Sequence, residues 1–233
     1  MSRSEIEQVR SRGTVVLAYF EIGSIENFRP EYPPVREQAP DLIFNRWDDW
    51  PEENFVAYWD ERWWDLVVRP RVDQAQKAGF DGVYMDTPLA YEEIDLQLAP
   101  GATRGTLARR MVELIVRISE YAKAQEPGFL VVPQNSPELR QVPGYVDAID
   151  GIGMEELFVL ATDELCTQDW CEENLDHTRV LRDLGKFVLA VDYADDPAMV
   201  ALAQRRQREE GFFGYVGPVE LNTVRPQSGH RGG

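Results

Sequence analysis

The sequence is poor in the residues that metal and thiol chemistry require. Its 233 residues include only two cysteines and two histidines, and no clustered histidine completes a zinc set with Cys166 and Cys171. It also lacks a Gly-x-Ser-x-Gly nucleophile motif, a phosphate-binding glycine loop and a helix with paired metal-binding histidines. We therefore expect no metal site and no cofactor. A histidine-dependent triad is disfavoured, and His177 and His230 are interpreted as surface residues.

Long apolar runs and basic charge are also scarce. No run of 18 apolar residues occurs, so the sequence predicts no membrane insertion. Residues 1–13 are polar and do not have the pattern of a signal peptide. The chain has 24 Lys and Arg against 41 Asp and Glu, a formal net charge of −17, which argues against a nucleic acid as partner. This charge is typical of a soluble acidic surface, and it would also attract a cationic substrate.

Glycines divide much of the chain into helix–strand units. In four places a helical stretch ends at a glycine and an apolar run follows, which is typical of a left-handed C-terminal cap followed by a strand. The runs are apolar on both faces, as strands of a covered parallel sheet are. The helical stretches are 6–12, 70–78, 178–184 and 197–210, the glycines are Gly13, Gly79, Gly185 and Gly211, and the strands are 14–20, 83–85, 187–191 and 212–216.

Two less regular units complete the pattern. Apolar residues from Leu107 to Tyr121 recur at helical spacing, and a strand follows at 129–132. Residues 144–147 lead into a glycine-bearing strand at 151–155. About six β/α units predict an α/β fold with a parallel sheet, open or closed. We expect a single domain over residues 1–224 and a disordered tail at 225–233.

Two long connections interrupt these units. Residues 24–64 are rich in proline and then in tryptophan, and residues 92–106 form a second insertion. A long connection inside a compact domain is usually functional, so the first is interpreted as a lid or a cleft wall. Its tryptophans would stack on sugar rings or, as is more common, pack in the core.

Two of the predicted strands end at an acidic residue. Alternation along a strand places Tyr84 and Asp86 on one face. The same parity groups Gly153 with Glu155, which favours Glu155 over its neighbour Glu156. Catalytic groups of parallel barrels lie at the C-terminal ends of strands, and glycoside hydrolysis uses two carboxyls that flank the scissile bond. Either acid alone would more often be a helix N-cap or a solvated charge, but the matched settings of the two favour an acid pair.

Six segments along the chain form a recognisable pattern in order and spacing over about residues 14–216. They are 16–23 with Glu26 and Arg29, 58–60 with Trp64, 79–86, 132–135, 150–158 and 191–193. Together they resemble glycoside hydrolase family 114. The resemblance implies a TIM-type (β/α) barrel that cleaves α-1,4-linked galactosamine-type polysaccharide, as an endo-α-1,4-polygalactosaminidase does.

The same resemblance implies roles for particular side chains. Asp86 and Glu155 would be the catalytic pair. The partner would be a cationic aminosugar polysaccharide, which would give the acidic charge a use. Six further side chains would line the substrate cleft: Tyr19, Glu26, Tyr84, Asn135, Asp192 and Tyr193.

The sequence departs from the family pattern in two ways. Family members begin with two further strands, so we expect a barrel of about six units that is incomplete at the N-terminus. Pro88 and Leu89 stand where the family commonly has a further aspartate. A non-catalytic or degenerate carbohydrate-binding barrel is therefore the alternative function.

The sequence leaves open where in or outside the cell the protein acts and whether its two cysteines form a disulfide. The resemblance implies an extracellular protein, and the missing signal-peptide pattern leaves a cytoplasmic one as the alternative. Cys166 and Cys171 would form a local disulfide in an oxidising compartment or remain two free thiols. Endo or exo action, retention or inversion, and oligomeric state are not indicated.

Overall fold

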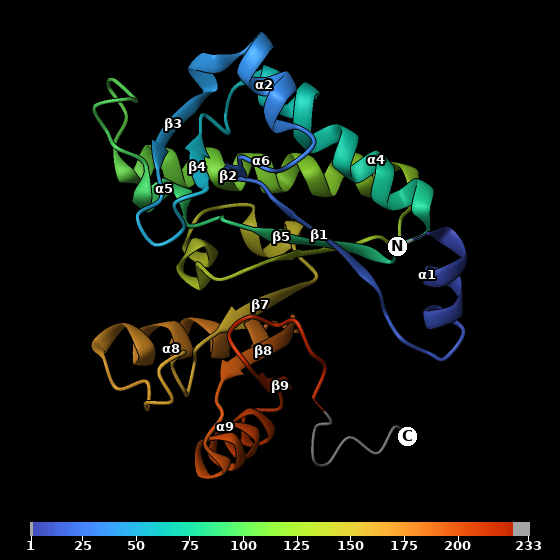
Figure 1. Cartoon of the computed structure of the whole chain (residues 1–233), viewed down its shortest axis with the longest axis vertical. Coiled ribbons are helices and arrows are strands. Elements are labelled where there is room, and N and C mark those ends of the chain that lie inside the picture. The colour runs from blue at the N-terminus through green and yellow to red at the C-terminus, as the bar shows by residue number, and fades with distance from the viewer. Residues whose placement is uncertain (1, 226–233) are drawn as a thin grey trace. The chain divides into compact units, whose positions relative to one another are not determined.

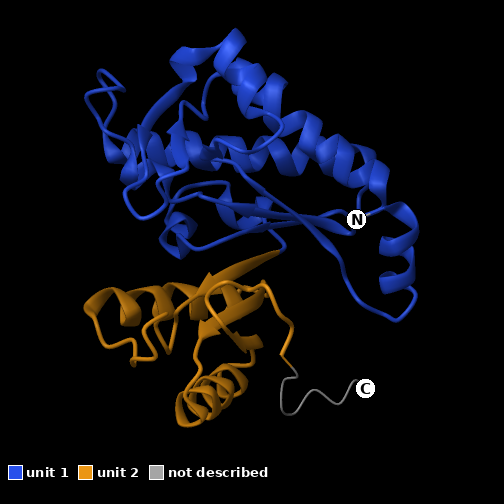
Figure 2. Ribbon diagram, in the orientation of Figure 1, with its two compact units in different colours: residues 1–150 blue, residues 151–233 orange. Residues whose placement is uncertain are grey.

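Contacts divide the chain into two compact units, Met1–Asp150 and Gly151–Gly233 (Figure 2). The computed structural model describes residues 2–225. Each unit contains a three-stranded parallel sheet, and the six parallel strands of the described residues correspond to the six expected β/α units. The α/β class is confirmed, and the single domain over residues 1–224 stays a prediction.

The first unit is built on strands β1 (Leu17–Glu21), β5 (Gly82–Asp86) and β6 (Leu130–Pro133), in the order β1-β5-β6. Strands β1 and β5 are labelled in Figure 1. The strands are parallel, and the register places Tyr19 opposite Tyr84 and Glu21 opposite Asp86. This register brings the C-terminal ends of β1 and β5 to the same edge of the sheet. The helices that connect or flank these three strands are α1 (Arg3–Arg10), α4 (Arg69–Ala78), α5 (Ala90–Glu93), α6 (Arg104–Gln125), η3 (Pro137–Gln141) and α7 (Tyr145–Ala148).

Helix α6 packs against β6 and α4 through one apolar face. Leu107, Met111, Ile115 and Ile118 recur every three or four residues and are fully buried. Burying one such side chain contributes about 1.5–3 kcal/mol to folding. The helical spacing predicted between Leu107 and Tyr121 is confirmed.

The connection at residues 24–64 contains a second, antiparallel sheet that the sequence did not predict. Its strands are β2 (Ser24–Glu26), β4 (Glu53–Val56) and β3 (Ile43–Arg46), in the order β2-β4-β3. Helices α2 (Tyr32–Gln38), η1 (Pro40–Leu42), α3 (Glu61–Trp63) and the π-helix η2 (Trp64–Val68) complete the segment. Strands of three or four residues are too short to show an alternating pattern.

The tryptophans of this segment divide between core and surface. Trp63 and Trp64 are buried, and the Trp63 indole N–H donates to the carbonyl oxygen of Ile22 at 2.9 Å. Trp50 is exposed. The core interpretation is therefore confirmed for Trp63 and Trp64.

The second unit contains strands β7 (Gly151–Glu155), β8 (Phe187–Tyr193) and β9 (Phe213–Gly217), which are parallel and lie in the order β7-β8-β9. Its helices are α8 (Asp169–Asp183) and α9 (Pro197–Glu209). The Asp196 carboxylate caps α9 by accepting from the backbone N–H groups of Ala198 at 2.8 Å and Met199 at 3.1 Å. Pro197 follows the cap in the first turn, where a proline is well tolerated.

Most boundaries predicted from glycine hold, and one histidine assignment does not. Helix α4 stops at Gly79, whose φ is +89°, and the other three predicted stops also have positive φ. Helix α8 begins at Asp169 rather than at Thr178. His177 lies on its inner side with 8% exposure, so its interpretation as a surface residue was wrong. His230 lies outside the described residues.

The predicted tail also lies outside the described residues, except at its first position. Arg225 donates through Nη1 to the Ala194 carbonyl oxygen at 2.9 Å, so this residue is tied to the second unit. Within residues 2–225, no helix is both long and apolar enough to cross a membrane.

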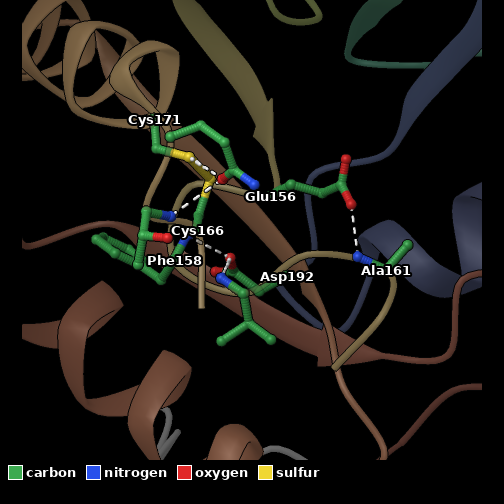
Figure 3. The surroundings of a disulfide bond; sticks show 9 residues. Glu156, Phe158, Ala161, Cys166, Cys171 and Asp192 are labelled. Carbon is green, nitrogen blue, oxygen red and sulfur yellow. Dashed lines mark hydrogen bonds between the residues drawn. A yellow bond between two sulfur atoms is a disulfide. The ribbon is translucent and has the colours of Figure 1, made fainter. Parts of the chain in front are cut away.

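The cysteine pair forms a disulfide, which decides between the two states left open by the sequence. Cys166 and Cys171 are five positions apart and both are buried. The bond joins the loop after β7 to the first turn of α8 (Figure 3). The Cys166 N–H also donates to the Phe158 carbonyl oxygen at 3.0 Å, which fixes the loop from the other side.

Opening this small loop should weaken the second unit moderately. Replacing both cysteines by serine should lower the free energy of unfolding by roughly 2 kcal/mol, because the unfolded chain regains the entropy of a short closed loop. Urea denaturation of the variant and of the oxidised parent measures the difference. Reduced parent protein is the control and should match the variant. Equal stability of the oxidised and reduced parent would contradict the prediction.

Candidate active site

Asp86 lies at the C-terminal end of β5 and is held by two neighbours. The Tyr19 hydroxyl, from β1, donates to Asp86 Oδ2, and the backbone N–H of Thr87 donates to Oδ1 at 2.6 Å. Because Tyr19 and Tyr84 are paired in register, their rings lie on the same face and stack with centroids 6.4 Å apart. Tyr84 and Asp86 therefore lie on the same face of the sheet, as the alternation along the strand predicted. Burial and then the Asp86 carboxylate raise the pKa of Tyr19, so it stays a donor.

Thr87 begins the loop after Asp86 in a backbone conformation that a β-branched residue seldom adopts. Its φ is +60°. Its hydroxyl oxygen accepts from the Gly23 N–H at 3.1 Å and lies 2.8 Å from Ser24 Oγ, and all three residues are buried. A Cβ on Gly23 would come within 2.3 Å of the Thr87 carbonyl oxygen, so the close approach of the two loops requires glycine there.

Four carboxyls lie near this strand end, and one guanidinium pairs with two of them. We call Glu21, Glu26, Glu53 and Asp86 the acidic cluster. The Arg29 guanidinium forms an ion pair with Glu21 and lies 2.5 Å from Glu26 Oε2. Burial and the neighbouring Glu21 raise the pKa of Glu26 to about 7. Burial and the Asp86 and Glu21 charges likewise raise the pKa of Glu53 to about 7, although Ser24 acts in the opposite direction.

Two members of the acidic cluster were not predicted as site residues. Glu21 ends β1 and is opposite Asp86, so its position follows from the pairing of two predicted strands. Glu53 begins β4 and pairs with Glu26 across the antiparallel sheet. Glu53 reaches the acidic cluster only through the fold of residues 24–64. The residues next to it in sequence, Glu52 to Phe55, give no sign that its side chain is buried.

Glu155 ends β7 in the second unit and repeats the arrangement of Asp86. The Tyr193 hydroxyl, from the neighbouring strand β8, donates to Glu155 Oε1. The adjacent Glu156 leaves the strand with φ of +56° and accepts from the Ala161 N–H at 2.5 Å, which closes the following loop. The choice of Glu155 over Glu156 as the residue in the strand agrees with these positions.

Asp192 has a different environment from the cleft position that the family resemblance implied. Its side chain has 0% exposure and, by strand alternation, points to the face opposite Tyr193. Its Oδ1 accepts from the N–H groups of Phe158 at 2.7 Å and Val159 at 2.9 Å (Figure 3). Its Oδ2 accepts from Gln207 Nε2 at 2.7 Å. This placement argues against contact with a substrate and indicates that Asp192 fixes the loop after β7.

Removing the Asp192 carboxylate should therefore affect stability first. Asp192→Ala should lower the free energy of unfolding by about 3 kcal/mol, because it leaves the backbone N–H groups of Phe158 and Val159 buried without acceptors. Urea denaturation measures this loss. Asp183→Ala, at a side chain with 67% exposure, is the matched control and should change stability by less than about 0.5 kcal/mol. A similar small effect at both positions would contradict the role given to Asp192.

The structure brings most of the predicted residues of each unit together. Tyr19, Tyr84 and Asp86 share one sheet face, and Arg29 connects Glu26 to them, with its guanidinium carbon 5.7 Å from the centre of the Tyr19 ring. Asn135 follows β6, the strand beside β5, with φ of +57°. The Gln134 N–H donates to the Met85 carbonyl oxygen at 2.9 Å, which places this loop next to the end of β5.

A cavity of about 480 Å³ lies elsewhere, beside the disulfide of the second unit. Its lining includes Cys166, Cys171, Arg179 and Arg206, and none of the predicted site residues. The geometry of the carboxyls is more informative about chemistry than the size of this cavity. Across residues 2–225, no group of three or more His, Cys, Asp or Glu side chains is arranged to hold a metal ion.

Comparison with protein families identifies the chain. The family described as Glycoside-hydrolase family GH114 matches residues 1–231. The chain belongs to glycoside hydrolase family 114. The resemblance noted in the sequence is thereby confirmed over nearly its whole length.

Relatives with similar sequences occur in both bacteria and archaea. An uncharacterized protein of Deinococcus radiodurans is 34% identical over 92% of this chain and 67% of its own length. Uncharacterized proteins of Thermotoga maritima and Methanocaldococcus jannaschii are 29% and 28% identical, each over 84% of this chain. The chain spans between 56% and 67% of the length of these relatives.

Solved structures show the same fold at low sequence identity. The complex of Aspergillus fumigatus Ega3 with galactosamine has a TM-score of 0.75 at 19% identity, over 96% of this chain and 82% of that one. The glycoside hydrolase domain of PelA from Pseudomonas aeruginosa has a TM-score of 0.72 at 17% identity, over 97% of this chain and 87% of that one. The α/β fold is therefore that of TIM-barrel glycoside hydrolases. Closure of the barrel and the absence of its first two strands stay predictions.

Proposed function

We propose that this family 114 member hydrolyses α-1,4-linked galactosamine-type polysaccharide, with Asp86 and Glu155 as its carboxylate pair. The observation that supports the pair is its repeated setting. Each acid ends a parallel strand and accepts a hydrogen bond from a tyrosine hydroxyl of the adjacent strand, Tyr19 in one unit and Tyr193 in the other. A carboxyl held in one orientation at a strand end is suited to proton transfer or nucleophilic attack.

Hydrolysis would divide two tasks between the acids. One carboxyl donates a proton to the leaving glycosidic oxygen, and the other acts as nucleophile or as the base that activates water. Tyr19 and Tyr193 orient the two acids through their hydroxyls. Galactosamine is the ligand named for the Ega3 complex, and the family supports a sugar of this type as the substrate here.

Neutral isosteres of the pair should abolish turnover. Asp86→Asn and Glu155→Gln should each reduce kcat on de-N-acetylated galactosamine polymer at least about 100-fold, because each removes a group that transfers a proton or attacks carbon. Release of reducing ends measures the rate, and circular dichroism checks the fold.

Glu156→Gln, one residue beyond the strand, is the control for Glu155→Gln and should keep most of the activity. Retained activity in both Asp86→Asn and Glu155→Gln would refute the assignment. Saccharide binding by calorimetry with no turnover in the parent protein would instead support the non-catalytic carbohydrate-binding alternative.

The acidic cluster gives the cationic substrate a local basis. Glu21, Glu26 and Glu53 accompany Asp86 at the ends of β1 and β5, and the single guanidinium there pairs with Glu21 and Glu26 only. An ammonium group on the sugar would find carboxylate acceptors there, whereas an N-acetyl group would bring no compensating charge. The charge of the whole chain, −17, would add long-range attraction for a polycation.

A preference for the free amine should follow and should depend on salt. We expect kcat/KM on de-N-acetylated polymer to exceed that on fully N-acetylated polymer at least about tenfold at low salt, and the gap to narrow at about 1 M salt because charges are screened. Glu26→Gln should reduce the preference, and the exposed Glu120→Gln, on α6, should not. Equal rates on both polymers would contradict recognition through charge.

The disulfide supports an extracellular place of action. Structural disulfides persist in oxidising environments and are rare in the cytosol, and a polysaccharide of a microbial matrix is found outside cells. We propose that the protein acts there. Fractionation that recovers it from the cytosol with Cys166 and Cys171 as free thiols would contradict this.

A further inference from the structure

A buried row of oxygens connects Glu53 to the backbone of Asp86. Glu53 Oε1 is hydrogen-bonded to Ser24 Oγ, which lies 2.8 Å from Thr87 Oγ1, which in turn lies 2.8 Å from the Asp86 carbonyl oxygen. The exposed fractions are 6% for Glu53 and 1% for both Ser24 and Thr87. Thr87 in turn gives its N–H to Asp86 Oδ1. The row therefore ends on the backbone of Asp86, and the N–H of Thr87 joins it to the carboxyl that the reaction would use.

The hydrogens along this row do not balance if Glu53 is ionised. Three oxygen–oxygen contacts need three hydrogens, and the hydroxyls of Ser24 and Thr87 supply two. An ionised Glu53 would leave one oxygen pair in contact with no hydrogen between its members. A protonated Glu53 donates to Ser24, Ser24 donates to Thr87, and Thr87 donates to the Asp86 carbonyl. Every contact is then a hydrogen bond.

The charges around Glu53 favour the same state. The titratable groups that face it are Glu21 and Tyr19 from β1, Glu26 from β2, Arg29 from the loop after β2 and Asp86 from β5. One cation among several acids cannot compensate every carboxylate at low solvent exposure. Burial and the neighbouring acids raise the pKa of Glu53 to about 7, in agreement with the hydrogen count.

We propose that Glu53 is a positioning residue that holds a proton in the folded protein and, through Ser24 and Thr87, fixes the carboxyl of Asp86. The inference rests on the proposed function in so far as Asp86 is a catalytic acid. The row also accounts for the strained backbone of Thr87, because its hydroxyl and its N–H are both used when φ is positive. Loss of the Glu53 proton removes the first donor of the row and adds a negative charge beside Asp86.

A comparison of Glu53→Gln with the parent enzyme isolates this proton. The glutamine amide can donate to Ser24 at every pH, so ionisations that both enzymes share cancel in the ratio of their kcat values. The ratio of variant to parent should rise about tenfold between about pH 6 and about pH 8, as expected for a group that loses its proton near pH 7. Glu53→Ala should lose at least about tenfold in kcat relative to the parent near pH 6, where the parent keeps the proton, with little change in KM.

Stability provides a second reading that needs no activity. The folded state keeps the Glu53 proton to a higher pH than the unfolded chain, whose glutamates titrate near 4.5. Between these values the folded state binds more protons, so the parent's free energy of unfolding falls as pH rises. Glu53→Gln lacks this loss, and its stability relative to the parent should grow from pH 5 to pH 8. Glu120→Gln, exposed on α6, should show no such change.

The two readings separate the possible failures. A kcat ratio that is constant with pH, or a Glu53→Gln enzyme as inactive as Glu53→Ala near pH 6, would overturn the inference. If the parent hydrolyses no galactosamine polymer, the proposed function fails and the stability comparison decides about Glu53. A stability difference that does not change with pH would then overturn the inference too. Thr87→Val should reproduce the kcat loss of Glu53→Ala, and Thr87→Ser, which keeps the hydroxyl, should restore it.

Discussion

The main constraint on the first unit is that several carboxyls lie close together at one strand end. Not all of them can be ionised at the same time. Arg29 compensates Glu21 and Glu26, and Tyr19 and Thr87 give hydrogen bonds to Asp86. Close carboxylates in a poorly solvated place repel one another, and a retained proton is the least costly relief. The raised pKa values of Glu26 and Glu53 are the expression of this constraint. In the proposed function, the carboxylates that stay ionised would supply the counter-charge for a sugar ammonium group.

Parallel pairing explains why Asp86 and Glu155, far apart in the chain, have similar settings. In β1-β5 and in β7-β8 the strands are parallel neighbours, so a tyrosine on one strand reaches the acid that ends the other. The sequence alone was enough to predict the two strands and the acids that end them. Gly79 stops a helix, the run that follows is apolar, and period-two alternation selects Asp86 and Glu155 from their neighbours. These features are local, and local rules determine them.

What the sequence could not predict depends on contacts between distant segments. Glu53 is a site residue only because a short antiparallel strand pairs with β2, and three or four residues leave no readable period. Asp192 and Tyr193 are adjacent in sequence, yet one is buried among backbone donors and the other reaches Glu155. The family pattern singles out both residues. It does not show which of them would contact a substrate and which only holds a loop in place. His177 was misplaced because the polar first half of α8 concealed its buried side.

The short spacing of the two cysteines has a consequence for how the protein matures. These 233 residues contain no other cysteine, so neither thiol has a wrong partner among them. The six residues from 166 to 171 are also close enough to meet as soon as they leave the ribosome or the export channel, before α8 or its sheet exists. The crosslink therefore needs an oxidant and no reshuffling, and expression in an oxidising host compartment should be sufficient to form it.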